Sequence, residues 1–171
     1  LIDVTSGGYG LPDLGTALLS KKSGGIKYRP LATSGGAESV LRLLSGDADM
    51  GQNSASTTVA HVKTGDLIPV LIESDSWPLL EAMGIPKSKA LFGYSISNPS
   101  AVVGPPGLPA PIRLEIQKAV KAALDDPTVK ANMEKTFEMV RFKTGTQARA
   151  IAVAARNGYL PVLRSVGKVL K

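Results

Sequence analysis

A single pattern recurs between Ile2 and Ile72. Each repeat is a short apolar or β-branched run, then a loop rich in Gly, Ser and Thr, then a segment whose apolar residues stand three or four positions apart. The short runs predict strands and the longer segments predict helices. The strand candidates are residues 2–5, 26–31, 48–52 and 67–72, and the helix candidates are residues 12–22, 36–45 and 57–63. This alternation predicts an α/β fold, with helices covering a mostly parallel sheet and right-handed crossovers.

A proline-rich stretch ends the pattern. Six prolines lie between residues 73 and 109, and we interpret this stretch as connective, with a helical turn at 77–83 and one strand at 100–103. The elements expected beyond it are a helix over 110–124, a helix from Pro127 to about Thr136, a strand over 139–142 and a long helix from Gln147. Gly158 and Pro161 predict a bend or break in the last helix. The residues expected to face inward there are Ile151, Ala155, Tyr159, Val162, Val166 and Val169.

The composition narrows the chemistry. A chain of 171 residues with 43% hydrophobic content can bury a sizeable core. It has no cysteine and one histidine, His61, which excludes disulfides, cysteine-held metals, a thiol nucleophile and any site with two imidazoles. We expect no metal and no cofactor. No apolar run approaches the roughly 20 residues that cross a bilayer, so the chain is not expected to be embedded in a membrane.

The positive charge is concentrated at one end of the chain. Residues 1–100 carry eight Lys and Arg against nine Asp and Glu, whereas residues 101–171 carry twelve against five. The basic residues stand at helical spacings, and Phe137, Phe142 and Tyr159 are far apart. This distribution favours solvated helix faces over a nucleic-acid interface.

A glycine-rich polar loop follows the first predicted strand, in the sequence Thr5-Ser6-Gly7-Gly8-Tyr9-Gly10. Glycines allow a tight turn and a close approach of the backbone to a ligand, and the helix that follows favours an anion such as a carboxylate or phosphate. A plain tight turn explains the same residues. A dinucleotide site does not fit, because Asp13 replaces the third glycine and no acid follows the second strand.

Two more polar loops, residues 32–36 and 52–56, follow the next strands. Loops after parallel strands meet at the same edge of a sheet, where ligands bind. Helix capping is the simpler role for Thr33, Ser54 and Ser56. Hydrolytic catalysis has little support, because His61 lies in a predicted helix and the chain has no G-x-S-x-G sequence.

Three stretches of sequence, together with a later one, resemble a known family. They are 4–10 (VTSGGYG), 41–50 (LRLLSGDADM) and 61–71 (HVKTGDLIPVL), followed by 103–109 (VGPPGLP) and 124–129 (LDDPTV). In order and spacing they are similar to the second half of the substrate-binding proteins of tripartite tricarboxylate transporters, the TctC or Bug family. Residues 34–40 (SGGAESV) also resemble the TAXI-type receptors of TRAP transporters.

The resemblance implies a periplasmic, non-enzymatic receptor with a type II periplasmic-binding-protein fold. Such a receptor would capture a small organic carboxylate and deliver it to membrane permease subunits, without nucleic acid as a partner. Its implied ligand-binding residues are Thr5, Ser6, Gly7, Gly8, Gly10, Ser34, Gly35, Asn53 and Ser54. The family commonly has Tyr-Lys-Gly where this chain has Thr33-Ser34-Gly35, so the ligand is not identified.

The resemblance also predicts how the chain is divided. Residues 1–98 would form a complete α/β ligand-binding lobe, residues 99–109 a crossover or hinge, and residues 110–171 the helical C-terminal part of another lobe. The apolar faces of that last part would be covered by an absent amino-terminal segment or by a second copy. Two other functions stay open at this point: a cytoplasmic effector-sensing domain of a transcription regulator, and a phosphate- or nucleotide-binding enzyme domain.

Overall fold

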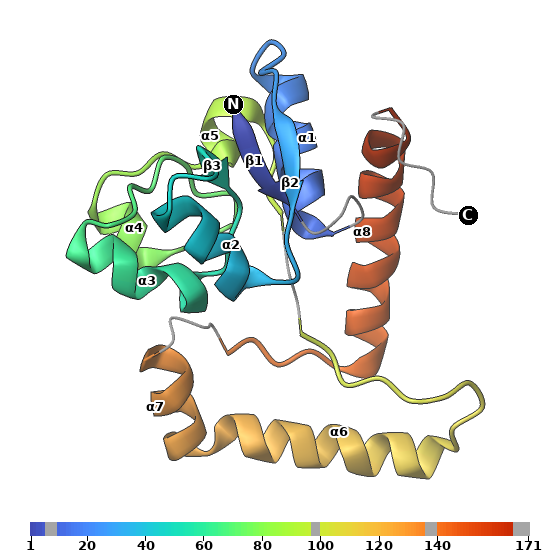
Figure 1. Ribbon diagram of the computed structural model, residues 1–171. Helices are drawn as coiled ribbons and strands as arrows, with labels where there is room; N and C mark the ends of the chain where they lie inside the picture. Colours follow the sequence, from blue (N-terminus) through green and yellow to red (C-terminus); the bar gives the residue numbers. More distant parts are fainter. Residues whose placement is uncertain (6–9, 97–99, 136–139, 166–171) are drawn as a thin grey trace. The chain divides into compact units, whose positions relative to one another are not determined.

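A computed structural model describes residues 1–5, 10–96, 100–135 and 140–165 (Figure 1). The chain divides into two compact units. Unit 1 comprises residues 1–98 and 157–171, and unit 2 comprises residues 99–156. The predicted α/β class is confirmed, with a small parallel sheet and many helices.

The sheet of unit 1 has three parallel strands in the order β2-β1-β3. They are β1 (Ile2–Thr5), β2 (Arg29–Ala32) and β3 (Met50–Gly51). The central strand β1 pairs along its whole length with β2, from Ile2 opposite Arg29 to Thr5 opposite Ala32. Because each strand returns to the sheet through a helix, the loops after the strands gather at one edge.

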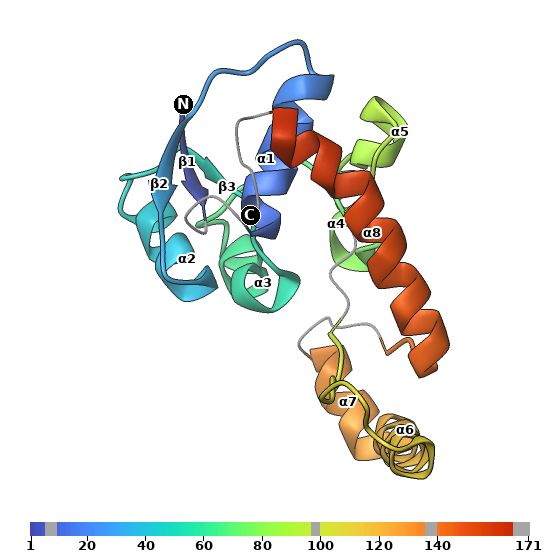
Figure 2. The ribbon, with the colours of Figure 1, turned by 90° about the vertical axis from the view of Figure 1, so that its right-hand side faces the viewer.

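Among the described residues, five helices lie wholly in unit 1. They are α1 (Leu11–Lys22), α2 (Gly36–Leu44), α3 (Ala55–Thr64), α4 (Pro78–Ala82) and α5 (Ser88–Phe92). In both views α1 and α2 flank β1 (Figures 1 and 2). The residues at both ends of α1 favour a helix there. Pro12 suits the first turn, and Lys21 and Lys22 stand in the last turn, where positive charges interact favourably with the helix dipole.

Two apolar clusters hold unit 1 together. The first joins Leu14 and Leu18 of α1 to Tyr94, Ile96 and Leu163, and the second joins Val62, Ile72 and Leu80. Leu163 comes from the last turns of α8 (Gly145–Ser165), and it explains why residues from Asn157 onward belong to unit 1. The sequence analysis placed them with the preceding helices.

Unit 2 contains α6 (Ala110–Asp125), α7 (Pro127–Lys135) and the first part of α8. No residue of α6 or α7 is buried. Large apolar side chains on α6 are half exposed, and those of the preceding segment are more so. They are Ile112, Leu114 and Ile116 on α6, and Val102 and Val103 before it.

Three predicted strands are wrong. Residues 67–72 form no strand, because Ile68 and Val70 face solvent and only Ile72 makes a bridge, to Lys87. Residues 100–103 pair with no strand among the described residues, and neither do residues 140–142. Met139, which began the last of these predicted strands, lies outside the described residues. β-branched runs stay unpaired when no neighbouring strand is present to complete the ladder.

The helices agree with the sequence to within a few residues, with two exceptions. Of the bend or break predicted near Gly158 and Pro161, the break is wrong, since α8 continues through Pro161 to Ser165, and the bend stays a prediction. The short helix α5 was not predicted. The apolar stripe of α8 is partly buried at Ile151, Ala155, Tyr159 and Val162, whereas Val166 and Val169 lie outside the described residues.

Candidate functional site

A small cavity of about 180 Å³ lies at the edge of the sheet where the parallel strands end. Residues from the end of β1, from the loops after β2 and β3, and from the starts of α1 and α2 line it. The lining residues are Val4, Thr5, Pro12, Thr33, Gly35, Gly36, Ser39, Gln52, Asn53 and Ser54. None of these side chains carries a charge. The three polar loops that the sequence expected to meet at this edge therefore do contribute to one cavity.

The first loop contributes Thr5 and Pro12 to the cavity. Thr5 is almost fully buried, and its carbonyl accepts hydrogen bonds from the Thr33 amide (2.8 Å) and hydroxyl (3.0 Å). Gly10, a predicted ligand residue, does not line the cavity, and its N–H donates to the Asp13 carboxylate at 3.0 Å. The predicted residues Ser6, Gly7 and Gly8 lie outside the described residues.

The second loop leads into α2. Of the two residues predicted here to bind the ligand, Gly35 lines the cavity and Ser34 does not. The Ser34 amide and hydroxyl both donate to the Glu38 carboxylate at 2.8 Å, which is a capping arrangement at the start of a helix. Glu38 also meets the Arg42 guanidinium at 3.3 Å, and these contacts hold the pKa of its carboxyl below the usual value.

The third loop supplies Asn53 and Ser54, both predicted and both in the cavity wall. The Ser54 hydroxyl is exposed and lies 3.1 Å from that of Ser56 and 3.2 Å from that of Thr57. By contrast, both polar atoms of the Asn53 carboxamide are buried and have no hydrogen-bond partner among the described residues. Burying polar groups without partners is costly, so such groups mark sites that await one.

Two cavity residues escaped the sequence analysis as ligand candidates. Ser39 lies one turn inside α2, 5% exposed, and its hydroxyl has no hydrogen-bond partner in the described part of the chain. The Gln52 carbonyl oxygen is likewise buried and unpaired there. Ser39 gave no signal, because a serine in a helix of mixed composition is indistinguishable from a surface serine until the helix face is known.

A cluster of three acids lies inside unit 1, with Asp3 and Asp13 buried and Glu73 partly buried. Burial raises the pKa of Asp3 to about 6, and the nearby charges of Asp13 and Glu73 add to the rise, while the Thr16 hydroxyl opposes it. Burial also raises the pKa of Glu73, whose carboxylate accepts a 2.7 Å hydrogen bond from Tyr94. No group of His, Cys, Asp and Glu among the described residues has a geometry that could hold a metal ion.

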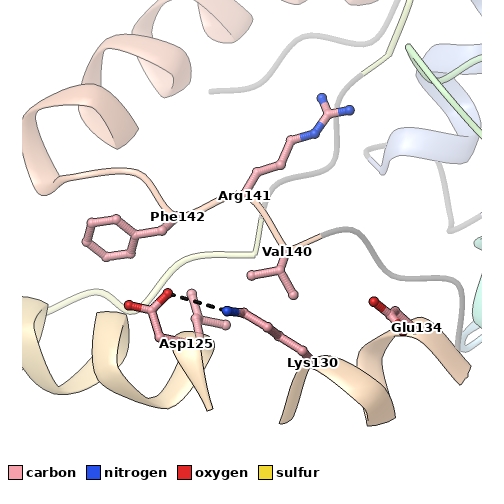
Figure 3. Close-up of a pocket in the computed structure, with 7 residues that line it drawn as sticks. Asp125, Lys130, Glu134, Val140, Arg141 and Phe142 are labelled. Carbon is pink, nitrogen blue, oxygen red and sulfur yellow. Dashed lines mark ion pairs between the residues drawn. The ribbon is translucent and has the colours of Figure 1, made fainter. Parts of the chain in front are cut away.

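A larger depression of about 540 Å³ lies within unit 2 (Figure 3). Its wall combines apolar residues with charged ones, of which Asp125 and Lys130 form an ion pair at 3.7 Å. Arg141 points away from this pair (Figure 3). The side chains of Asp125 and Lys130 are about half exposed. None of the described residues that line this depression has a buried polar side-chain atom without a hydrogen-bond partner, in contrast to the cavity of unit 1.

His61 has no place in either cavity. It lies in α3, as the sequence predicts, and its Nδ1 is 3.7 Å from an Asp66 carboxylate oxygen. None of the described helices has the length and apolar character needed to span a membrane.

Comparison of the structure with solved proteins gives two informative neighbours. "R. palustris Rpa4515 with adipate" matches with a TM-score of 0.82 and 18% identity over 98% of this chain. A TctC solute-binding protein from Polaromonas, without ligand, matches with a TM-score of 0.73 and 17% identity over 96% of it. The fold is that of a TctC-type solute-binding protein. The resemblance noted in the sequence is thus confirmed at the level of fold.

The chain spans little more than half of either neighbour, 56% of the first and 57% of the second. The sequence itself matches no family model and no curated protein. At these identities the comparison shows the fold alone, and the function has to be argued from the cavity itself.

Proposed function

We propose that this chain is the ligand-binding part of a non-enzymatic receptor for a small organic carboxylate. The observation that carries the proposal is the cavity at the strand ends, where the buried hydroxyl of Ser39 and the buried carboxamide of Asn53 lack partners among the described residues. A TctC-type fold around that cavity supports it, as does the adipate in one neighbour.

An uncharged lining is compatible with an anionic ligand. Hydrogen bonds to a carboxylate are roughly twice as strong as those between neutral groups, and backbone N–H groups at a helix start add a favourable dipole. The cavity offers hydroxyls, carboxamides and the first turn of α2. At about 180 Å³ it has room for one end of a small acid rather than for a drug-sized ligand.

The cellular role follows from the same proposal. A binding protein of this fold would work outside the cytoplasm, in the periplasm, and would hand its carboxylate to the permease subunits of a tripartite transporter. The similarity of fold to two solute-binding proteins supports this role.

Calorimetric titration with adipate tests the function, with 1,6-hexanediol as a control of equal carbon number and no charge. We expect adipate to bind and the diol to release no measurable heat. NMR of the recovered adipate should show it unchanged, as expected of a receptor. Equal binding of diol and diacid, or chemical conversion of the acid, would contradict the proposal.

We also propose that residues 1–98 correspond to one receptor lobe and that unit 2 packs against further protein. The half-exposed apolar side chains of Ile112 and Ile116 on α6, and the more exposed Val103, support this view. Burying a large aliphatic side chain contributes about 1.5 to 3 kcal/mol, so several exposed together favour a covering surface. We expect that cover to come from additional chain amino-terminal to residue 1, in keeping with the greater length of both neighbours.

A dye that fluoresces on apolar surface measures this directly. The 171-residue chain should bind the dye, and Ile116→Glu should reduce the binding. Ser165→Glu, which alters an exposed position with no apolar side chain, is the control. Dye binding that is absent in the unaltered chain would argue against the proposed cover.

A further inference from the structure

Helices α1, α2 and α3 all begin beside the cavity, and the amino ends of α1 and α2 differ electrostatically. At the start of α1, Pro12 has no N–H to offer and the Gly10 N–H already donates to the Asp13 carboxylate. Asp13 is only 4% exposed, and its charge reaches Asp3 on the neighbouring strand. A second anion placed there would be repelled by the buried acids Asp3 and Asp13, of which Asp13 already raises the pKa of Asp3.

The start of α2 is more favourable. Gly35 and Gly36 both line the cavity, and the first N–H groups of a helix have no partner within the helix. The acid of this first turn, Glu38, is bound to Ser34 and to the cation of Arg42. Glu38 does not line the cavity, and its negative charge is balanced by Arg42.

A second and independent observation points to the same place. The Ser39 hydroxyl, on the first turns of α2, is buried in the cavity wall with no partner among the described residues. A serine hydroxyl inside a helix normally bonds to the carbonyl four residues earlier or points to solvent. Ser39 does neither, and the unpaired carboxamide of Asn53 borders the same cavity.

We propose that the carboxylate group of the ligand binds at the amino end of α2, held by the Ser39 hydroxyl, the Asn53 amide and the first backbone N–H groups of that helix. This assignment rests on the proposed function and relocates the anion, which the sequence analysis placed on the glycine-rich loop before α1. Ser39 thereby becomes a ligand-binding residue.

The test is calorimetric titration of the full chain with adipate, using Ser39→Ala and Asn53→Leu. We expect each variant to lower the affinity about tenfold or more, because a hydrogen bond to a charged group is lost. Ser45→Ala is the matched control, since Ser45 follows the carboxyl end of the same helix, lines neither cavity and donates its hydroxyl to the Arg42 carbonyl at 3.2 Å, and its affinity should stay within twofold.

Thermal unfolding separates a binding role from a structural one. Ser39→Ala removes a hydroxyl that makes no bond within the described chain, so its melting temperature in the absence of adipate should be unchanged or higher. Weaker binding together with undiminished stability supports the assignment. Unchanged affinity in both variants, or a marked loss of stability in Ser39→Ala, overturns it while leaving the proposed function intact. Failure of the unaltered chain to bind any adipate overturns both.

Discussion

The buried carboxyl groups of Asp3 and Asp13 lie on the central strand and on the helix that follows it, and the charge of Asp13 raises the pKa of Asp3. Asp3 is fully buried, and desolvation is the larger cause of its raised pKa of about 6. Between the ordinary value of 3.8 and this one, the unfolded chain has lost a proton that the folded chain still holds. Stability therefore falls as the pH rises through that window and is level above it.

We predict that Asp3→Asn stabilises the protein at pH 7. A shift of roughly two pKa units corresponds to about 3 kcal/mol, an upper limit because the new amide must find its own partner. Urea unfolding at pH 4 and pH 7 should show a gain at pH 7 that shrinks at pH 4. If the difference in unfolding free energy between the variant and the unaltered protein were the same at pH 4 and pH 7, the buried-acid explanation would be contradicted.

A second prediction concerns the contact between β1 and β3, where Val4 lies opposite Gly51. A Cβ added at Gly51 would collide with the Val4 side chain, its partner in the sheet register. Gly51→Ala should destabilise unit 1 by about 1 to 3 kcal/mol, as overpacking does.

Gly158→Ala is the matched control for Gly51→Ala. Nothing lies within 4 Å of an added Cβ at this position in α8. It should stabilise the protein by about 0.5 to 1 kcal/mol, because alanine is the better helix former. Chemical denaturation measures both, and similar effects from the two variants would contradict the packing argument.

We further predict that His61 has no part in ligand binding. Its side chain is half-buried beside Asp66 on α3 and contributes to no described cavity. His61→Ala should leave the affinity for adipate within twofold. A loss of affinity as large as that expected of Ser39→Ala would contradict this prediction.

The Asn53 carboxamide leads to a prediction about selectivity. Its oxygen and its nitrogen are both unpaired, so a ligand that brings an O–H donor beside its carboxylate satisfies more of the site. L-Malate should therefore bind more tightly than succinate, from which it differs by one hydroxyl, by about fivefold or more. Titration of both acids into Asn53→Leu should show no preference.

Local patterns in the sequence were enough to predict the central strand and, with the exception of α5, the described helices. The spacing of Leu14 and Leu18 marks the buried face of α1, and both residues do lie in the core. Strands such as 100–103 could not be predicted correctly, because a strand needs a partner and β-branched residues alone do not supply one. The loops that hold Gly35 and Asn53 were located from their position after a strand, and the family resemblance implied that these two residues bind the ligand.

What the sequence could not reveal was which polar groups are already occupied. Ser34 and Asn53 look equally suitable for a ligand, yet Ser34 is bonded to Glu38 while Asn53 has no partner among the described residues. Ser39 was overlooked because its burial depends on how α2 packs against the sheet. These distinctions depend on tertiary structure.

The strand order β2-β1-β3 has a consequence for how the protein is made. Of these three strands the central one is synthesised first, and both of its neighbours are encoded later, the second only at Met50. At synthesis rates of about 5 to 20 residues per second, both edges of β1 stay open for seconds. An unpaired apolar edge is a template for pairing with other chains. We therefore expect nascent or slowly synthesised protein to depend on a chaperone that shields residues 1–5 until β3 has emerged.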